Sequence, residues 1–279
     1  MNYKIDSHFL AEITRHHRLQ GYTYAIKSLS YERCAELPYI LQQLQHRFKE
    51  KLNFLDIGSG ESPLPTYLLV HTNWNIYCVD KFNWVQKQKD FARKFMPDIE
   101  IEKRLHIVEK DFLIEKFQER FYDIITNISV IEHFEGVTDS TAMKLSAQLL
   151  KPGGIYILTT LINEGFYKEF YVKGNVYGEQ SRTNQKVFWQ RHYDVNSVQE
   201  RLIKPSGLKE VNRIYFGDYN YRFYEKLLKL PKLLKPVKVL YSWATPFFAK
   251  KYLHYSDSPI SYSDMKMDTS SGIILTFSK

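Results

Sequence analysis

Asp56, Gly58 and Gly60 are the first group of residues whose types and spacing could do chemistry. They end the apolar run 54–57, which predicts a buried strand, and a Ser-Pro pair then favours a helix start at Ser62. Glycine permits positive φ and lets a ligand approach the backbone closely. The stretch, with Ser59 between the glycines, predicts a strand–turn–helix cradle beside a carboxylate.

The acidic character of this turn distinguishes two kinds of nucleotide cofactor. A dinucleotide places its pyrophosphate on the helix N-terminus, usually over a GxGxxG pattern. Here Pro63 replaces the third glycine, and Glu61 would repel a pyrophosphate. S-adenosylmethionine has an ammonium and a sulfonium and no phosphate, so it suits Asp56 and Glu61 better. A purely structural glycine turn is the alternative that this stretch leaves open.

More polar side chains follow the next apolar runs. Asp80 lies beyond the glycine turn where a carboxylate usually binds a ribose diol, although a helix cap is the alternative. Asp111 and Phe112 combine an acceptor for an exocyclic amine with a ring that can pack on a purine. The three groups at strand ends are Asp80 with Lys81, Asp111 with Phe112, and Asn127 with Ile128.

Apolar runs and helical segments alternate from residue 54 to residue 160. Consecutive strand–helix–strand crossovers indicate an α/β fold with a doubly wound, mostly parallel sheet. Two late apolar runs, 211–216 and 272–277, complete the sheet. Residues 1–50 read as an N-terminal helical cap, in which His16-His17-Arg18 reads as a solvated helix face, and residues 51–279 as the cofactor-binding domain.

Two segments interrupt this alternation. Residues 161–193 form an aromatic, glycine-containing stretch that reads as a functional loop. Residues 221–265 form a basic insertion, in which positions 225–251 contain seven lysines and one glutamate and so contribute +6 of the chain's net +8. Pro231 and Pro236 argue against a clean amphipathic helix there. We expect contact with an anionic or membrane surface through 225–251, and a solvated lysine face is the alternative.

Several motifs in order resemble the class I S-adenosylmethionine-dependent methyltransferases. They are Leu55-Asp56-Ile57-Gly58-Ser59-Gly60, Asp80, Asp111-Phe112, Tyr122-Asp123-Ile124-Ile125 and Leu149-Leu150-Lys151-Pro152-Gly153-Gly154. The resemblance implies a Rossmann-like seven-stranded sheet with an antiparallel last strand. It also implies that the backbone around Gly58 and Gly60 holds the methionine part of the cofactor. Asp80, with Lys81 beside it, would hold the ribose, Asp111 and Phe112 the adenine, and Asn127 and Ile128 would lie under the cofactor.

Two histidines are candidates for a general base, since a histidine pKa lies near working pH. His133 follows the fourth strand, and His192 ends the aromatic stretch beside Arg191, which could hold an anionic group. A backbone-bonded histidine and a helix-entry role are the respective alternatives. No cysteine or histidine pattern indicates a metal, and two cysteines indicate a reducing, cytoplasmic location. No apolar run is long enough to span a bilayer.

We therefore expect a cytoplasmic methyltransferase that uses S-adenosylmethionine to methylate a small molecule at oxygen, with the aromatic stretch and the basic insertion shaping the acceptor pocket. The alternatives are a lipid-linked or protein acceptor, and a protein that binds the cofactor or a partner without turnover. Nucleic acid is a weak option, because no recognition motif accompanies the basic segment. The oligomeric state is not legible in the sequence.

Overall fold

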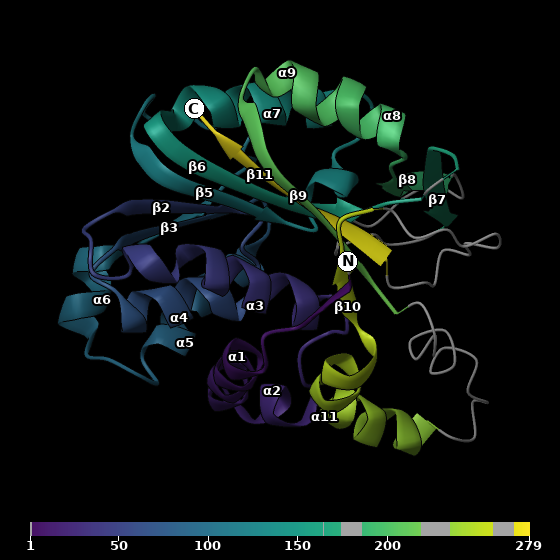
Figure 1. Ribbon diagram of the computed structural model, residues 1–279. Helices are drawn as coiled ribbons and strands as arrows, with labels where there is room; N and C mark the ends of the chain where they lie inside the picture. Colours follow the sequence, from purple (N-terminus) through teal and green to yellow (C-terminus); the bar gives the residue numbers. More distant parts are fainter. Residues whose placement is uncertain (1, 164, 174–185, 219–234, 259–270) are drawn as a thin grey trace.

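The computed structural model describes residues 2–163, 165–173, 186–218, 235–258 and 271–279. These residues form a nine-stranded sheet in the order β1-β10-β9-β11-β6-β5-β2-β3-β4, with a separate two-stranded sheet, β7-β8 (Figure 1). The strands are β1 (Asn2–Lys4), β2 (Asn53–Ile57), β3 (Asn75–Asp80), β4 (Leu105–Glu109), β5 (Tyr122–Ile128), β6 (Leu150–Leu161), β7 (Lys168–Lys173), β8 (Lys186–His192), β9 (Lys209–Gly217), β10 (His254–Ser256) and β11 (Ser271–Ser278).

Helices cover both faces of the sheet (Figure 1). They are α1 (Ser7–Leu19), α2 (Tyr22–Ile26), α3 (Arg33–Leu44), α4 (Pro63–His71), α5 (Lys87–Ala92), α6 (Asp98–Arg104), α7 (Thr138–Leu149), α8 (Val195–Val198), α9 (Lys204–Ser206) and α11 (Lys235–Tyr252), with short turns η1 (Gln45–Arg47), η2 (Asn83–Gln86), η3 (Ile131–His133) and η4 (Gln199–Ile203). Helices α7 to α9 lie on one face, and α3 to α6 on the other.

Strands β2, β3 and β5 are each followed by helices before the next strand, as parallel neighbours require. Strand β2 pairs in parallel with β3 and β5, while β11 runs antiparallel to both β6 and β9. Central strands buried on both faces need apolar residues at successive positions, and Phe54, Leu55 and Ile57 are all almost fully buried. The predicted doubly wound sheet with an antiparallel last strand is confirmed.

The sheet of the described residues exceeds the expected seven strands by two. Strands β1 and β10 add antiparallel to the free side of β9, with Tyr3 opposite Tyr255 and Tyr255 opposite Phe216. Each added strand has three residues. A run this short carries too little alternation to be recognised in the sequence.

The stretch 161–193 is not simply a loop, as the sequence analysis expected. Its described parts form the antiparallel hairpin strands β7 and β8, in which Glu169 lies opposite Arg191 and Lys168 opposite His192. In addition, residues 151–154 of the Leu149–Gly154 motif lie inside β6, at a pairing irregularity beside β5. Aromatic residues favour strands as well as loops, so aromatic content alone did not separate the two.

The expectation of a solvated His16-His17 face is wrong, because both side chains are buried. Helix α1 packs against α4, and His16 Nε2 lies 2.9 Å from Thr66 Oγ1. The His16 ring also stacks on Phe95 with a centroid distance of 4.2 Å. Burial lowers the pKa of His16 to about 3, so its ring stays neutral and forms part of the packing between the cap and the domain.

The described part of the basic insertion is a helix, α11, followed by β10. Pro236 is the second residue of α11, where proline is tolerated because its missing N–H has no partner to lose. Pro231 and the lysines at 226, 229 and 232 lie outside the described residues. No helix of the described chain is both long and apolar enough to cross a bilayer.

A buried ion cluster fastens the hairpin to the domain. Asp139 and Arg191 are both fully buried, with Arg191 Nη1 3.1 Å from Asp139 Oδ2. Arg201 Nε and the Tyr193 hydroxyl donate to the same carboxylate oxygen at 2.8 and 2.9 Å. Arg191 also donates to the carbonyl of Gly136 at 2.9 Å. The start of α7, strand β8 and η4 thus share one carboxylate.

We expect Arg191→Met to destabilise the protein by about 3–5 kcal/mol, because it leaves the Asp139 charge buried with one cation fewer. Urea unfolding followed by circular dichroism measures this loss. The matched control is Arg93→Met, which removes an exposed arginine paired with Asp90 and Asp98 and should change stability little. Equal effects of the two substitutions would contradict a structural role for the cluster.

Candidate active site

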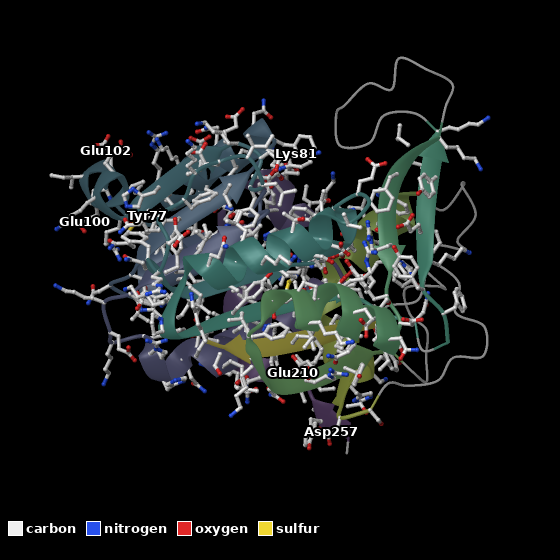
Figure 2. All side chains as sticks on the ribbon, turned by 90° about the horizontal axis from the view of Figure 1, so that it is seen from above. Tyr77, Lys81, Glu100, Glu102, Glu210 and Asp257 are labelled. Carbon is white, nitrogen blue, oxygen red and sulfur yellow. The ribbon has the colours of Figure 1, made fainter. Side chains whose placement is uncertain are left out.

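A cavity of about 1080 Å³ opens at the carboxyl edge of the parallel strands. Its walls come from the β2–α4 turn, the ends of β3 and β5, the residues after β4, the cap around Ser28–Ser30 and the β7–β8 hairpin. Figure 2 shows Lys81, at this edge, on the side of the hairpin, whereas Glu100 and Glu102 of α6 lie at the opposite end. Ligands of open α/β sheets bind at this carboxyl edge.

The glycine turn after β2 has two different requirements for glycine. Gly58 has φ +71°, and a Cβ there would lie 2.5 Å from both methyl groups of Val130. Gly60 has φ +46°, and its nearest neighbours are Asp80 and Trp84 at ordinary contact distances. Gly58 is therefore required by packing against the chain itself, while Gly60 borders the cavity wall.

Side chains from three elements hold the turn in place. The backbone N–H of Gly60 donates to Asp80 Oδ2 at 3.0 Å. On α5, the buried Gln88 donates through Nε2 to the carbonyls of Gly60 and Ser62 at 3.1 and 2.9 Å. Glu61 accepts from the Tyr24 hydroxyl at 2.6 Å and pairs with Lys87. The turn is therefore fixed before any ligand arrives.

Asp56 lies under the turn and is only 2% exposed. Thr126 donates its hydroxyl to Asp56 Oδ1 at 2.6 Å, and Ser59 donates to the Asp56 carbonyl at 2.7 Å. Burial raises the pKa of Asp56 to about 7, against the opposing effect of the hydrogen bond from Thr126. A cation in the cavity beside Asp56 would favour its ionised form.

Asp80 and Asp111 lie at successive positions along the edge. The other oxygen of Asp80, Oδ1, accepts from the Phe82 N–H at 3.0 Å, and burial raises the pKa of Asp80. Asp111 Oδ1 accepts from the Leu113 N–H at 2.8 Å. Phe112 is buried, contacts Phe117 and lines the cavity. Lys81 also lines the cavity, close to the Phe82 ring.

The cavity floor beneath β5 carries a buried charge network. Arg33, which lines the cavity, donates to the carbonyl of Ile128 at 2.9 Å and pairs with the fully buried Glu36. Glu36 Oε1 accepts from the hydroxyls of Ser129 and Thr159 at 2.6 and 2.7 Å. This network ties α3 of the cap to the ends of β5 and β6 and places one guanidinium at the cavity.

Asn127 and Ile128 differ in their positions. Ile128 lines the cavity, whereas Asn127 is fully buried behind it and accepts from the Ile131 N–H at 3.0 Å. The Asn127 amide nitrogen has no partner among the described residues. Asn127 therefore shapes η3, which carries His133, and is not part of the cavity lining.

The hairpin supplies an aromatic wall opposite the acidic edge. Tyr171, Phe188 and Trp189 line the cavity together with Phe134. His133 joins this wall: its Nδ1 lies 2.7 Å from the Trp189 carbonyl, which can only accept, so Nδ1 carries the proton. Burial lowers the pKa of His133 to about 4, and its ring is therefore neutral near pH 7.

His192 and Arg191 do not line this cavity. His192 is buried against Phe170, and its Nε2 accepts from Gln190 Nε2 at 3.1 Å. Arg191 is committed to the Asp139 cluster described above. All of the predicted cofactor-binding residues except Asn127 thus line the cavity. Of the two predicted histidines, only His133 lines it.

Four contributors to the site were not predicted from the sequence: Arg33, Gln88, Trp84 and the 28–30 segment. Arg33 and residues 28–30 belong to the cap, whose distance in sequence from the glycine turn hides their role. Gln88 is the residue with a readable signal, because a buried glutamine on an amphipathic helix must find hydrogen-bond partners. Its position on the inner face of α5 could have indicated contact with the turn.

The model of the methyltransferase domain family matches residues 29–199, more than half of the chain. The chain therefore belongs to this family. The identification as a class I S-adenosylmethionine-dependent methyltransferase is confirmed, and S-adenosylmethionine is the cofactor that goes with it. A search of the curated proteins finds no match.

Three solved structures share the fold at low identity. The first is a 1,6-didemethyltoxoflavin-N1-methyltransferase from Burkholderia thailandensis with bound 1,6-didemethyltoxoflavin and S-adenosylhomocysteine, which is 14% identical over 97% of this chain and 86% of that chain, with a TM-score of 0.54. The second is the [4+2]-cyclase SpnF, which is 15% identical over 88% of this chain and 82% of that chain, with a TM-score of 0.51. The third is a SAM-dependent methyltransferase from Methanosarcina mazei, which is 11% identical over 85% of this chain and 96% of that chain, with a TM-score of 0.51. Such identities establish the fold alone. The cyclase illustrates that one fold hosts different chemistries.

The donor set of the cavity fits S-adenosylmethionine. Asp80 offers carboxylate oxygens for hydroxyl groups, and the neighbouring Phe112 and Trp84 rings offer flat apolar surfaces. Asp56 offers negative charge for a cationic head, while the Arg33 guanidinium offers a partner for a carboxylate. The close turn at Gly60 leaves backbone exposed to the cavity.

We expect Gly58→Ala to destabilise the protein by about 2–4 kcal/mol, because the new Cβ meets Val130 and adopts a left-handed conformation. The control is Gly153→Ala, at φ +75° with nothing within 4 Å of its Cβ, which should cost about 1 kcal/mol from conformation alone. Chemical denaturation compares the two. Equal losses would show that Val130 does not constrain the turn.

Whereas the lowered pKa values of His16, His133 and His192 make stability rise with pH below about 6.5, the contribution of Glu132 to stability should fall as the pH rises from 5 to 8. Burial raises its pKa from 4.5 to about 8, so between these values the folded state binds more protons than the unfolded chain. Glu132→Gln should remove this contribution, so the stability of the wild type relative to the variant should fall by on the order of 1–3 kcal/mol across this window. Urea midpoints at pH 5, 6, 7 and 8 measure it, and parallel curves for both proteins would contradict the assignment. The Asp56 contribution should persist in the variant.

Proposed function

We propose that this protein transfers a methyl group from S-adenosylmethionine to an oxygen of a small molecule that has an aromatic or enolic hydroxyl. The observation that carries the proposal is that one continuous cavity of about 1080 Å³ joins the acidic strand ends to the aromatic wall beside His133. This volume is at the upper end of the range typical of ligand pockets, so cofactor and acceptor can share it.

When bound, S-adenosylmethionine supplies a methyl group on a sulfonium that is already a good leaving group. The chain's task is then largely alignment, which can lower a barrier by several kcal/mol. The Asp80 carboxylate would accept hydrogen bonds from the ribose hydroxyls, and Asp111 with Phe112 would hold the adenine. The backbone of Gly58 to Gly60 would border the methionine part, and Arg33 would pair with its carboxylate.

His133 would accept the proton that the acceptor hydroxyl loses. Its Nδ1–H is committed to the Trp189 carbonyl, so a second proton must go to Nε2. A base with a pKa of about 4 is weak, and general-base catalysis works best when the pKa of acid and base are not far apart. This mismatch favours acidic hydroxyls such as phenols and enols over aliphatic alcohols. The rings of Tyr171, Phe188 and Trp189 suit a planar acceptor of this kind.

A second candidate is methylation of a lipid-linked acceptor, which the exposed aromatic face of α11 supports. A protein acceptor or cofactor binding without turnover has no comparable observation in its favour. The buried free thiols of Cys34 and Cys78 support a reducing compartment such as the cytoplasm.

The test is turnover of S-adenosylmethionine carrying a trideuterated methyl group, with a library of phenolic, enolic, aliphatic and lipid-linked acceptors, read by mass spectrometry. We expect His133→Asn to lower kcat by about 10²–10⁴-fold on the accepted hydroxyl compound. His192→Asn is the control, since His192 is a buried histidine outside the cavity, with its pKa also lowered to about 4. It should keep near-native turnover.

The pH profile adds an independent check. Activity of the wild type should decline only towards pH 4, where His133 becomes protonated. Equal turnover of both variants, or an acid limb near pH 6.5, would rule out His133 as the base. Labelled product on lipid-linked acceptors alone would replace the small-molecule proposal by the second candidate.

A further inference from the structure

Helix α11 presents an apolar stripe to solvent. Leu240, Trp243 and Phe247 are 68%, 54% and 68% exposed, and Val239 beside them is 49% exposed. Spacings of three and four residues place such side chains on one helix face. The opposite face, which includes Thr245 and Ala249, is buried against the N-terminal helices. The helix is therefore apolar on both sides, which a purely solvent-facing helix is not.

The tryptophan of this stripe is held outward by the body of the protein. Arg18 of α1 donates through Nη2 to the Trp243 carbonyl at 2.9 Å. Its guanidinium carbon lies 5.0 Å from the centre of the Trp243 ring. Figure 1 shows α11 beside α1 and α2. The exposed side chain thus belongs to a packed helix that is anchored to the cap.

Charge identifies the partner of this stripe. The 18 residues of α11 include four lysines and no aspartate or glutamate. Lys250 and Lys251 are exposed and follow Phe247 by three and four residues, so they continue the same face. In sequence, the lysines at 226, 229 and 232 precede the helix. Trp, Phe and Leu beside lysines form the composition of helices that lie in the interface of an anionic bilayer.

We propose that α11 docks this protein onto an anionic phospholipid surface. Trp243 and Phe247 enter the headgroup boundary, and Lys250 and Lys251 contact lipid phosphates. A second copy of the chain is a poor occupant, because it would bring Lys250 and Lys251 of this face against the same lysines of the other copy. The proposal rests on α11 alone and stands independently of the reaction at the cavity.

Docking through α11 would bring the lipid surface near the cavity. Helix α11 packs on α1 and α2. His17 of α1 and residues 28–30, just after α2, line the cavity. The same helices therefore support both the docking face and one wall of the site.

Vesicle flotation tests the proposal with the full chain. Phosphatidylcholine vesicles with and without about one-third phosphatidylglycerol should differ about tenfold or more in binding, and the difference should shrink in high salt. Trp243→Ser/Phe247→Ser should lower binding to the anionic vesicles by about tenfold or more. Lys250→Gln/Lys251→Gln should weaken binding several-fold and reduce its dependence on salt.

The matched control is Ile99→Ser/Ile114→Ser, which removes two apolar side chains that are 74% and 81% exposed elsewhere, and should bind as the wild type does. Equal recovery with neutral and anionic vesicles would overturn the proposal, as would undiminished binding of the Trp243/Phe247 variant. The proposal would also be overturned if the wild type bound no vesicle and sedimented with a larger mass than the Trp243/Phe247 variant. The stripe would then be a self-association surface.

Discussion

The hydrogen bond from the Gly60 N–H to Asp80 Oδ2 joins the two parts of the site that must stay in register. Gly60 belongs to the turn after β2, and Asp80 ends β3, the neighbouring parallel strand. With Gln88 holding the Gly60 carbonyl from α5 and Val130 packed against Gly58 from the η3 side, the turn is constrained from three directions. A cavity with such a wall meets its ligand with little rearrangement, which lowers the cost of binding.

The pKa values of the carboxyl groups at this edge depend on the same close packing. Asp56, Asp80 and Glu132 all have raised pKa values because burial disfavours their charged forms. Arg33 is the cation that lies at the cavity floor, where it pairs with Glu36. Of these three groups Asp56 and Asp80 line the cavity, and their carboxyl groups favour a ligand that brings positive charge. The charge of the cavity lining and the family of the chain therefore both indicate a sulfonium cofactor.

Local patterns made the domain readable from the sequence. Asp56, Asp80 and Asp111 each lie at or just beyond the end of an apolar run. Both the sheet and most of the residues that line the cavity at its carboxyl edge could therefore be predicted. What failed depended on contacts between distant segments. His16 is buried and Arg33 reaches the cavity because the cap packs on the domain. Strand β10 is defined by pairing to β9, and β1 by pairing to β10. His133 and His192 looked alike in sequence, and only the fold separates the one that lines the cavity from the one that does not.

Calorimetric titration of the wild-type protein with S-adenosylmethionine, S-adenosylhomocysteine and NAD most directly tests the central claim that this edge binds a sulfonium nucleoside. The account predicts saturable binding of the first two at one site per chain and no heat with NAD. Binding of NAD, or no binding of either adenosyl compound to the folded protein, would contradict it.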